Sequence, residues 1–239
     1  RLAGLTFPGT YALTARRYFH EFGSTHDDLV HVSVKNHMHG FENEAAHLRK
    51  QVSFEKAQSG FMVADPLTLY DCCPTSDGAS AVILVADHLA HKFTDTPVWV
   101  KGSGAGSDHL ALHDRPSITQ LRATQSAAAK AYKTASISAS DVDLAEVHDC
   151  FTIAEVLATE DLGFAGRGLG GSFAREGEGR RNEGSVTINA SGGLKSKGHP
   201  LGATGTGQAV EIFKQLRHQV EPERQVRDAE IGLTHLSLI

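Results

Sequence analysis

The second half of the chain alternates short apolar runs with amphipathic helical segments, and this alternation limits the folds that it can adopt. From residue 98 onward the order is strand, helix, strand, helix, strand, helix, strand. Parallel strands need a long crossover, usually a helix, so this order predicts helices packed on a largely parallel sheet. The predicted strands are residues 98–100, 142–147, 186–188 and 231–233, and the predicted helices are residues 117–132, 151–162 and 204–216.

The first half of the chain gives fewer signals. Residues 10–23 predict a helix because apolar side chains recur there at helical spacing. Thr25 and Asp28 predict a capping box that opens a second helix. The apolar run at residues 81–85 is short enough for a strand buried on both faces. Residues 37–63 are polar and mixed in character, and we predict no helix or strand for them.

Composition excludes several classes of protein. Hydrophobic residues make up 40% of the chain and charged residues 21%, which is too apolar for a disordered protein. The net charge of −5 argues against nucleic acid as a partner. No apolar run approaches the roughly 20 residues of a membrane span. Cys72 and Cys73 are adjacent and the chain has three cysteines, which argues against a disulfide framework and favours a reducing, cytoplasmic location.

One candidate site is the sequence from Val147 to Phe151, which carries His148, Asp149 and Cys150 at a strand-to-helix junction. Ligands and catalytic groups in open α/β sheets gather at the carboxyl ends of strands. A cysteine at the start of a helix lies near the positive end of the helix dipole, so we expect a lowered thiol pKa. The alternative is a buried cysteine beside a capping aspartate.

A second candidate site is the segment 189–207, which follows the next predicted strand and contains six glycines. Glycines let the backbone approach a ligand closely, and Pro200 restricts the conformation of His199. The segment contains neither a P-loop nor a dinucleotide-binding fingerprint. It could be only a tight turn, but two such turns that each carry a histidine indicate a shared site.

Three further features carry less weight. His37 and His39 could suggest a metal pair, but no further ligand pattern accompanies them, so we predict no metal site. Cys72 and Cys73 lack the C-x-x-C spacing and favour packing over chemistry. The glycine- and arginine-rich segment 163–184 is long enough to suggest a functional loop.

The sequence His148-Asp149-Cys150-Phe151, followed by the segment from Gly198 to Gly205 (G-H-P-L-G-A-T-G), resembles the thiolase superfamily. H-D-C-F in place of N-E-A-F is similar to the sterol-carrier-protein-type thiolases and archaeal acetyl-CoA acetyltransferases. The resemblance extends over nearly the whole chain, because residues 34–37 and 71–79 fit the same group.

This resemblance implies a thiolase-like, layered α/β/α fold with a mostly parallel mixed sheet, and two similar halves. Residues 1–95 would form the tail of the first half and residues 96–239 the second half, truncated at its last strand. The implied reaction is Claisen condensation of acetyl-CoA to acetoacetyl-CoA, or its thiolytic reverse. Coenzyme A thioester would be the substrate, no cofactor is implied, and a homo-oligomer is expected.

The resemblance also implies roles for individual residues. His199 would activate a nucleophilic cysteine, His148 would support the same oxyanion site, and Cys150 would carry protons. Cys73 would approach the pantetheine arm of the substrate. At the start of the glycine-rich segment, Ser191 and Gly192 are further candidates for substrate binding, and His235 is expected near the site.

Two departures from the family pattern lead us to expect a fragment. Neither Cys72 nor Cys73 lies in the context of the family's nucleophile, and the last motif, after Thr234-His235, is broken. We therefore expect no thiolase turnover from this chain alone. The alternatives are a thiolase-like retro-aldolase of lipid or steroid side chains, which works without that cysteine, and a non-catalytic CoA-binding or scaffold subunit. Many archaeal relatives assemble with a zinc-ribbon and OB-fold protein, which is a possible partner.

Overall fold

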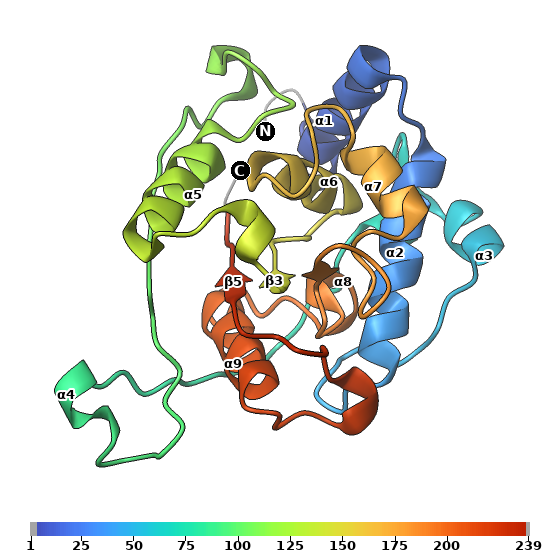
Figure 1. Cartoon of the computed structure of the whole chain (residues 1–239). Helices are drawn as coiled ribbons and strands as arrows, with labels where there is room; N and C mark the ends of the chain where they lie inside the picture. The colour runs from blue at the N-terminus through green and yellow to red at the C-terminus, as the bar shows by residue number, and fades with distance from the viewer. Residues whose placement is uncertain (1–3, 238–239) are drawn as a thin grey trace.

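A small parallel sheet lies at the centre of the chain (Figure 1). The structure, a computed structural model, describes residues 4–237. Strand β3 (Leu144–Glu146) is flanked by β4 (Thr187–Ile188) and β5 (Gly232–Thr234), and both neighbours run parallel to it. The predicted parallel sheet is therefore confirmed, although its strands are short and most of the ordered structure is helical.

Local signals explain the first two helices. Helix α1 (Phe7–Phe22) ends at Gly23, whose φ of 71° is the left-handed conformation that glycine adopts at little cost. Helix α2 (His26–Phe41) begins with the predicted Thr25–Asp28 capping box. Helix α2 extends to Phe41, into the segment 37–63 that had no predicted element, and it packs against α3, α6, α7 and α8.

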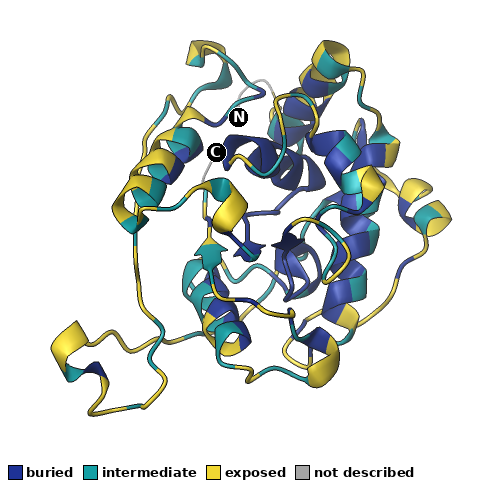
Figure 2. Cartoon of the chain, viewed as in Figure 1, coloured by how far each residue is buried: buried dark blue, intermediate teal, exposed yellow. Residues whose placement is uncertain are grey.

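Of the remaining helices, α3 packs on α2 and α4 lies on a separate arm, while the others lie around the sheet (Figure 1). Helix α6 follows β3, and all of its residues are buried (Figure 2). The segment predicted as a functional loop, 163–184, contains helix α7. The bounds are α3 (Phe54–Gln58), α4 (Asp87–Ala90), α5 (Arg122–Ala135), α6 (Thr152–Asp161), α7 (Gly170–Glu176), α8 (Gly193–Ser196) and α9 (Thr204–Leu216), with an antiparallel pair β1 (Met62–Ala64) and β2 (Leu67–Thr68).

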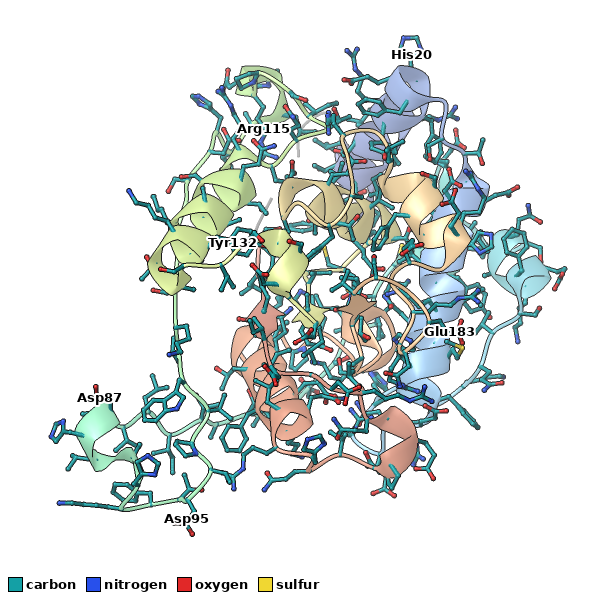
Figure 3. All side chains as sticks on the ribbon, viewed as in Figure 1. His20, Asp87, Asp95, Arg115, Tyr132 and Glu183 are labelled. Atoms are coloured by element: carbon teal, nitrogen blue, oxygen red, sulfur yellow. The ribbon has the colours of Figure 1, made fainter. Side chains whose placement is uncertain are left out.

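The predicted strands at 81–85 and 98–100 are wrong. Both segments belong to an arm that carries α4 away from the body, with Asp87 and Asp95 on it (Figures 1 and 3). Ile83 is 91% exposed and Val100 is 75% exposed. An apolar run becomes a strand only when a neighbouring strand pairs with its backbone, and no strand within residues 4–237 pairs with either segment.

Tertiary hydrogen bonds explain two other errors. Helix α5 begins at Arg122 and not near Ser117, because the Leu121 amide donates to buried Asp161 (2.7 Å). The helical spacing of residues 204–216 predicts an inward face with Ala209, Phe213 and Leu216, but in α9 Phe213 is 38% exposed and Leu216 is the one of the three that packs against a buried apolar cluster. The buried face of α9 carries Glu211 and Gln215, which bind buried Arg224.

At the carboxyl end of the chain, β5 confirms the last predicted strand, while residues 238–239 lie outside the described residues. Within residues 4–237 there is no helix both long and apolar enough for a transmembrane span.

Candidate active site

The two turns singled out in the sequence meet at one edge of the sheet. His148 follows β3, and the segment that carries His199 follows β4, which pairs with β3 in parallel. Because parallel neighbours end at the same edge, their following turns come together there. The rings of His148 and His199 lie with their centroids 5.1 Å apart at 83°. The structure therefore brings these two candidate residues into one place.

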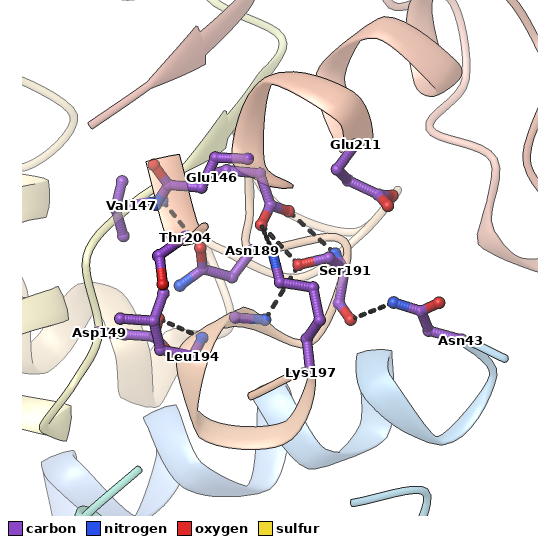
Figure 4. A network of polar contacts seen from close by, with 12 residues as sticks. Asn43, Glu146, Val147, Asp149, Asn189, Ser191, Leu194, Lys197, Thr204 and Glu211 are labelled. Atoms are coloured by element: carbon purple, nitrogen blue, oxygen red, sulfur yellow. Dashed lines mark hydrogen bonds and ion pairs between the residues drawn. The ribbon is translucent and has the colours of Figure 1, made fainter. Parts of the chain in front are cut away.

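Asp149, in the first turn, is hydrogen-bonded to the backbone of the second turn. Its carboxylate accepts hydrogen bonds from the backbone amides of Leu194 (2.7 Å) and Lys195 (3.3 Å) at the start of α8 (Figure 4). Gly193 has a φ of 60°, and a Cβ there would lie 2.3 Å from a carboxylate oxygen of Asp149. The capping role considered for Asp149 is therefore real, but the helix that it caps belongs to the other turn.

Helix α2 packs against both turns, and its buried polar side chains bind residues in and near them. The Asn36 amide donates to Asp149 Oδ2 and to Glu155 Oε2, each at 2.8 Å. Glu155 also accepts from Asn189 Nδ2 (2.8 Å) and pairs with Lys35 (2.8 Å). Burial, followed by the nearby Glu155 carboxylate, raises the pKa of Asp149 to about 7. These partners of Asp149 were not chosen as site residues from the sequence, because only the folded chain brings α2 to the turns.

Ser191 and Gly192 are buried at the start of the second turn. Ser191 donates from its amide (2.9 Å) and its hydroxyl (2.5 Å) to the carboxylate of Glu146, and Asn43 donates to the Ser191 carbonyl (Figure 4). A Cβ on Gly192 would lie 2.6 Å from the Cα of Gly40. These contacts fix the path of the turn, and direct substrate contact by either residue stays a prediction.

The hydrogen bonds of His199 determine which nitrogen carries its proton. His199 Nδ1 lies 2.8 Å from the hydroxyl of Thr204, and that hydroxyl donates to the carbonyl of Pro200 (3.1 Å). Because a hydroxyl has one proton, Thr204 must accept from Nδ1–H. Burial, followed by the charge of Lys197, lowers the pKa of His199. His199 is thus a neutral imidazole whose Nε2 can accept a proton.

His148 and His235 are neutral for the same reason. Burial, followed by the neighbouring His199 and His235, lowers the pKa of His148 to about 3. Burial lowers the pKa of His235 to about 4, and its Nε2 lies 2.9 Å from the hydroxyl of Thr124. His235 follows β5 directly, so the third strand of the sheet also contributes a histidine to this edge.

The expectation of a lowered Cys150 pKa is wrong. Cys150 is 4% exposed, and burial raises the pKa of its thiol. It precedes Phe151, the N-cap of α6, and the loss of hydration outweighs the attraction of the helix dipole. The backbone of Cys72 and Cys73 lies beside that of Cys150 and Phe151. The Cys73 amide donates to the Cys150 carbonyl (2.9 Å), and Cys72 forms an isolated antiparallel β-bridge with Phe151. Cys150 is therefore a protonated thiol at neutral pH.

An open depression of about 420 Å³ adjoins the second turn. It is lined by residues 76–80 and 200–203, and Ser76 accepts a hydrogen bond from the His199 amide (3.3 Å). A larger open depression of about 780 Å³ lies at the start of α5, and its lining contains none of the candidate residues. Neither lining contains a candidate residue, and of the two only the smaller depression includes residues of the segment that carries His199.

The structure offers no metal centre within residues 4–237, because no three His, Cys, Asp or Glu side chains are grouped to hold an ion there. Both nitrogens of His39 are already used, at the Asn189 carbonyl (3.0 Å) and the Arg181 amide (3.2 Å). His37 Nδ1 lies 3.2 Å from the carbonyl of Lys50.

The mostly helical α/β fold, with its small parallel sheet, defines a thiolase-like α/β domain. The chain belongs to this family, because the family described as Thiolase C-terminal domain-like matches residues 104–237. The resemblance drawn from the sequence is therefore confirmed.

Individual relatives agree with this assignment. The chain is 50% identical over 232 residues to "Acetyl-CoA acetyltransferase" from Methanothermobacter thermautotrophicus, covering 97% of this chain and 60% of that protein. It is 33% identical over 233 residues to "Sterol carrier protein 2" from Oryctolagus cuniculus, covering 95% of this chain and 42% of that protein. The solved structure "Ltp2-ChsH2(DUF35) aldolase" matches with a TM-score of 0.87 and 25% identity, covering 97% of this chain and 60% of that chain. The chain thus spans at most 60% of the length of these relatives.

Proposed function

We propose that this chain carries the acid–base part of an acyl-CoA acyltransferase site, which serves the Claisen condensation of acetyl-CoA to acetoacetyl-CoA or its thiolytic reverse. The observation that carries this proposal is the pair of imidazole rings, His148 and His199, whose centroids lie 5.1 Å apart. Claisen chemistry develops negative charge on a thioester oxygen, and N–H donors held in a buried site stabilise such charge.

Each residue has a distinct role in this proposal. The free Nε2 of His199 takes the proton of the nucleophilic thiol and then donates to the oxyanion. His148 is the second donor to that oxyanion. In thiolysis the Cys150 S–H gives its proton to the α-carbon as the C–C bond breaks. In condensation the thiol first protonates the departing coenzyme A thiolate, and the Cys150 thiolate that remains takes the α-proton. Cys73, beside Cys150, lies along the pantetheine arm.

We further propose that the nucleophilic cysteine lies outside the 239 residues, because none of the three cysteines here has the family's nucleophile context. Residues 1–95 and 96–239 would then be parts of two layered α/β halves in a cytoplasmic homo-oligomer. Acetoacetyl-CoA thiolysis tests this reading: the chain alone is expected to give no turnover, and clear cleavage would contradict it.

The second candidate is a thiolase-like retro-aldolase, which the similarity to the Ltp2-ChsH2(DUF35) aldolase favours. That structure pairs a thiolase-like chain with a DUF35 protein. A non-catalytic CoA-binding or scaffold role with a zinc-ribbon and OB-fold partner is therefore the third candidate. The coding sequence upstream of Arg1 discriminates between them. A preceding half with the nucleophilic cysteine favours the acyltransferase, and one without it favours the aldolase or the scaffold.

The assigned role of His199 has its own test. Thr204→Val removes the acceptor of Nδ1–H, so the proton is expected to redistribute toward Nε2. Long-range ¹⁵N–¹H NMR of the His199 ring reports the tautomer directly. An unchanged tautomer in Thr204→Val, or an Nε2–H tautomer in the unmodified chain, would contradict the assignment of His199 as the base.

A further inference from the structure

Cys150 needs a polar partner if it is to exchange a proton while buried. A thiolate formed away from water and without a donor carries a large desolvation cost. Its thiol lies 3.2 Å from the phenol oxygen of Tyr11, to which it donates a hydrogen bond. The residue that meets this need is therefore on helix α1, 139 positions away along the chain.

Tyr11 is held firmly in this position. It is 1% exposed, and its ring stacks on that of Phe151 with centroids 4.4 Å apart at 28°. Burial, followed by the neighbouring Cys150, raises the pKa of the phenol, so the O–H stays protonated. A neutral phenol has both a lone pair to accept the S–H and a proton to donate.

We propose that Tyr11 is a positioning residue for Cys150: it accepts the S–H hydrogen bond in the resting site and donates its own O–H to the sulfur when the thiol proton has left. In the carbon–carbon bond step the proton moves between Cys150 and the α-carbon of the substrate, and Tyr11 keeps its own. This inference rests on the proposed function only in taking Cys150 as the proton carrier.

Tyr11→Phe removes one hydroxyl and keeps the ring stack. Tyr18→Phe is a matched control, because Tyr18 is fully buried on the same helix and its phenol bonds to Glu160 instead. The readout is the Raman S–H stretching band of Cys150, assigned by its loss in Cys150→Ala. In Tyr11→Phe the band is expected to shift to higher wavenumber, and in Tyr18→Phe it is expected to stay.

The rate at which this S–H becomes S–D in D₂O provides the second readout, because that exchange passes through the thiolate. Loss of one neutral hydrogen bond is expected to slow it about two- to tenfold in Tyr11→Phe. A purely structural role predicts the opposite sign, since looser packing admits water and speeds exchange. An unshifted band, or exchange that is not slowed, overturns the proposal.

If Tyr11→Phe does not fold, replacement of all four tyrosines by 3-fluorotyrosine serves instead. The fluorinated phenol is a weaker acceptor, so the Cys150 band should again shift to higher wavenumber, and no shift overturns the proposal. Both readouts are independent of acyl-CoA chemistry. If the chain has no acyl-CoA activity, the S–H band and the exchange rate of Cys150 can still be measured. If Tyr11 proves to have no effect on Cys150, the proposed acyltransferase site is not thereby contradicted.

Discussion

Replacement of Asn36 by leucine tests whether α2 holds the two turns together. The Asn36 amide donates to two buried carboxylates, those of Asp149 and Glu155, at 2.8 Å each, and all three residues are at most 3% exposed. Hydrogen bonds to charged groups contribute about 1.5–3 kcal/mol each, so the loss of both should lower the free energy of unfolding by about 3–6 kcal/mol. That is a large part of the roughly 5–15 kcal/mol of a typical domain.

Urea unfolding followed by circular dichroism at pH 8, where Asp149 is mostly ionised, measures this loss. The midpoint for Asn36→Leu should fall by at least about 1 M with little change in the slope. Gln58→Leu is the matched control, because Gln58 donates to Asp27 (2.6 Å) at the exposed surface, and a change within about 0.5 kcal/mol is expected there. An Asn36→Leu effect as small as that of the control would refute the reasoning.

Two more perturbations address the same edge of the sheet. Gly193→Ala places a Cβ 2.3 Å from the Asp149 carboxylate at a φ of 60°, so urea unfolding should report a loss of more than about 2 kcal/mol, whereas Gly202→Ala, with no atom within 4 Å, should change little. Burial lowers the pKa of His148 to about 3 and of His235 to about 4, below the unfolded value near 6.5. The stability that these two histidines contribute is complete above pH 6.5 and is lost as pH falls toward 4. Between pH 6 and 4, His235→Asn should reduce the slope of the unfolding free energy against pH by about 1.4 kcal/mol per pH unit, as measured by urea unfolding at several pH values. An unchanged slope would contradict this expectation.

The sequence predicted the elements that local chemistry determines. Helix α1 followed from the helical spacing of apolar side chains in residues 10–23, and α2 followed from the Thr25–Asp28 capping box. The strands around 144–146, 187–188 and 232–234 followed from apolar runs between helices. The two turns of the candidate site were visible for the same reason, since each joins a strand to a helix.

Features that depend on distant parts of the chain could not be predicted in this way. The buried face of α9 includes Glu211 beside apolar Ile212, because Arg224 pairs with Glu211, and no helical periodicity encodes that ion pair. The apolar run at 81–85 lacks a strand partner within residues 4–237. The Cys150 thiol sits at a helix start, as predicted, but its burial against Tyr11 reverses the expected pKa shift.

Hydrogen exchange at C2 of acetyl-CoA in D₂O, followed by mass spectrometry, tests the central claim most directly, because it requires the acid–base residues but not the nucleophilic cysteine. The account predicts exchange faster than in buffer alone, reduced at least about 100-fold by Cys150→Ala and unchanged by Cys72→Ala. Exchange no faster than in buffer, or exchange that survives Cys150→Ala, would contradict the assignment of an acyl-CoA site to His148, Cys150 and His199.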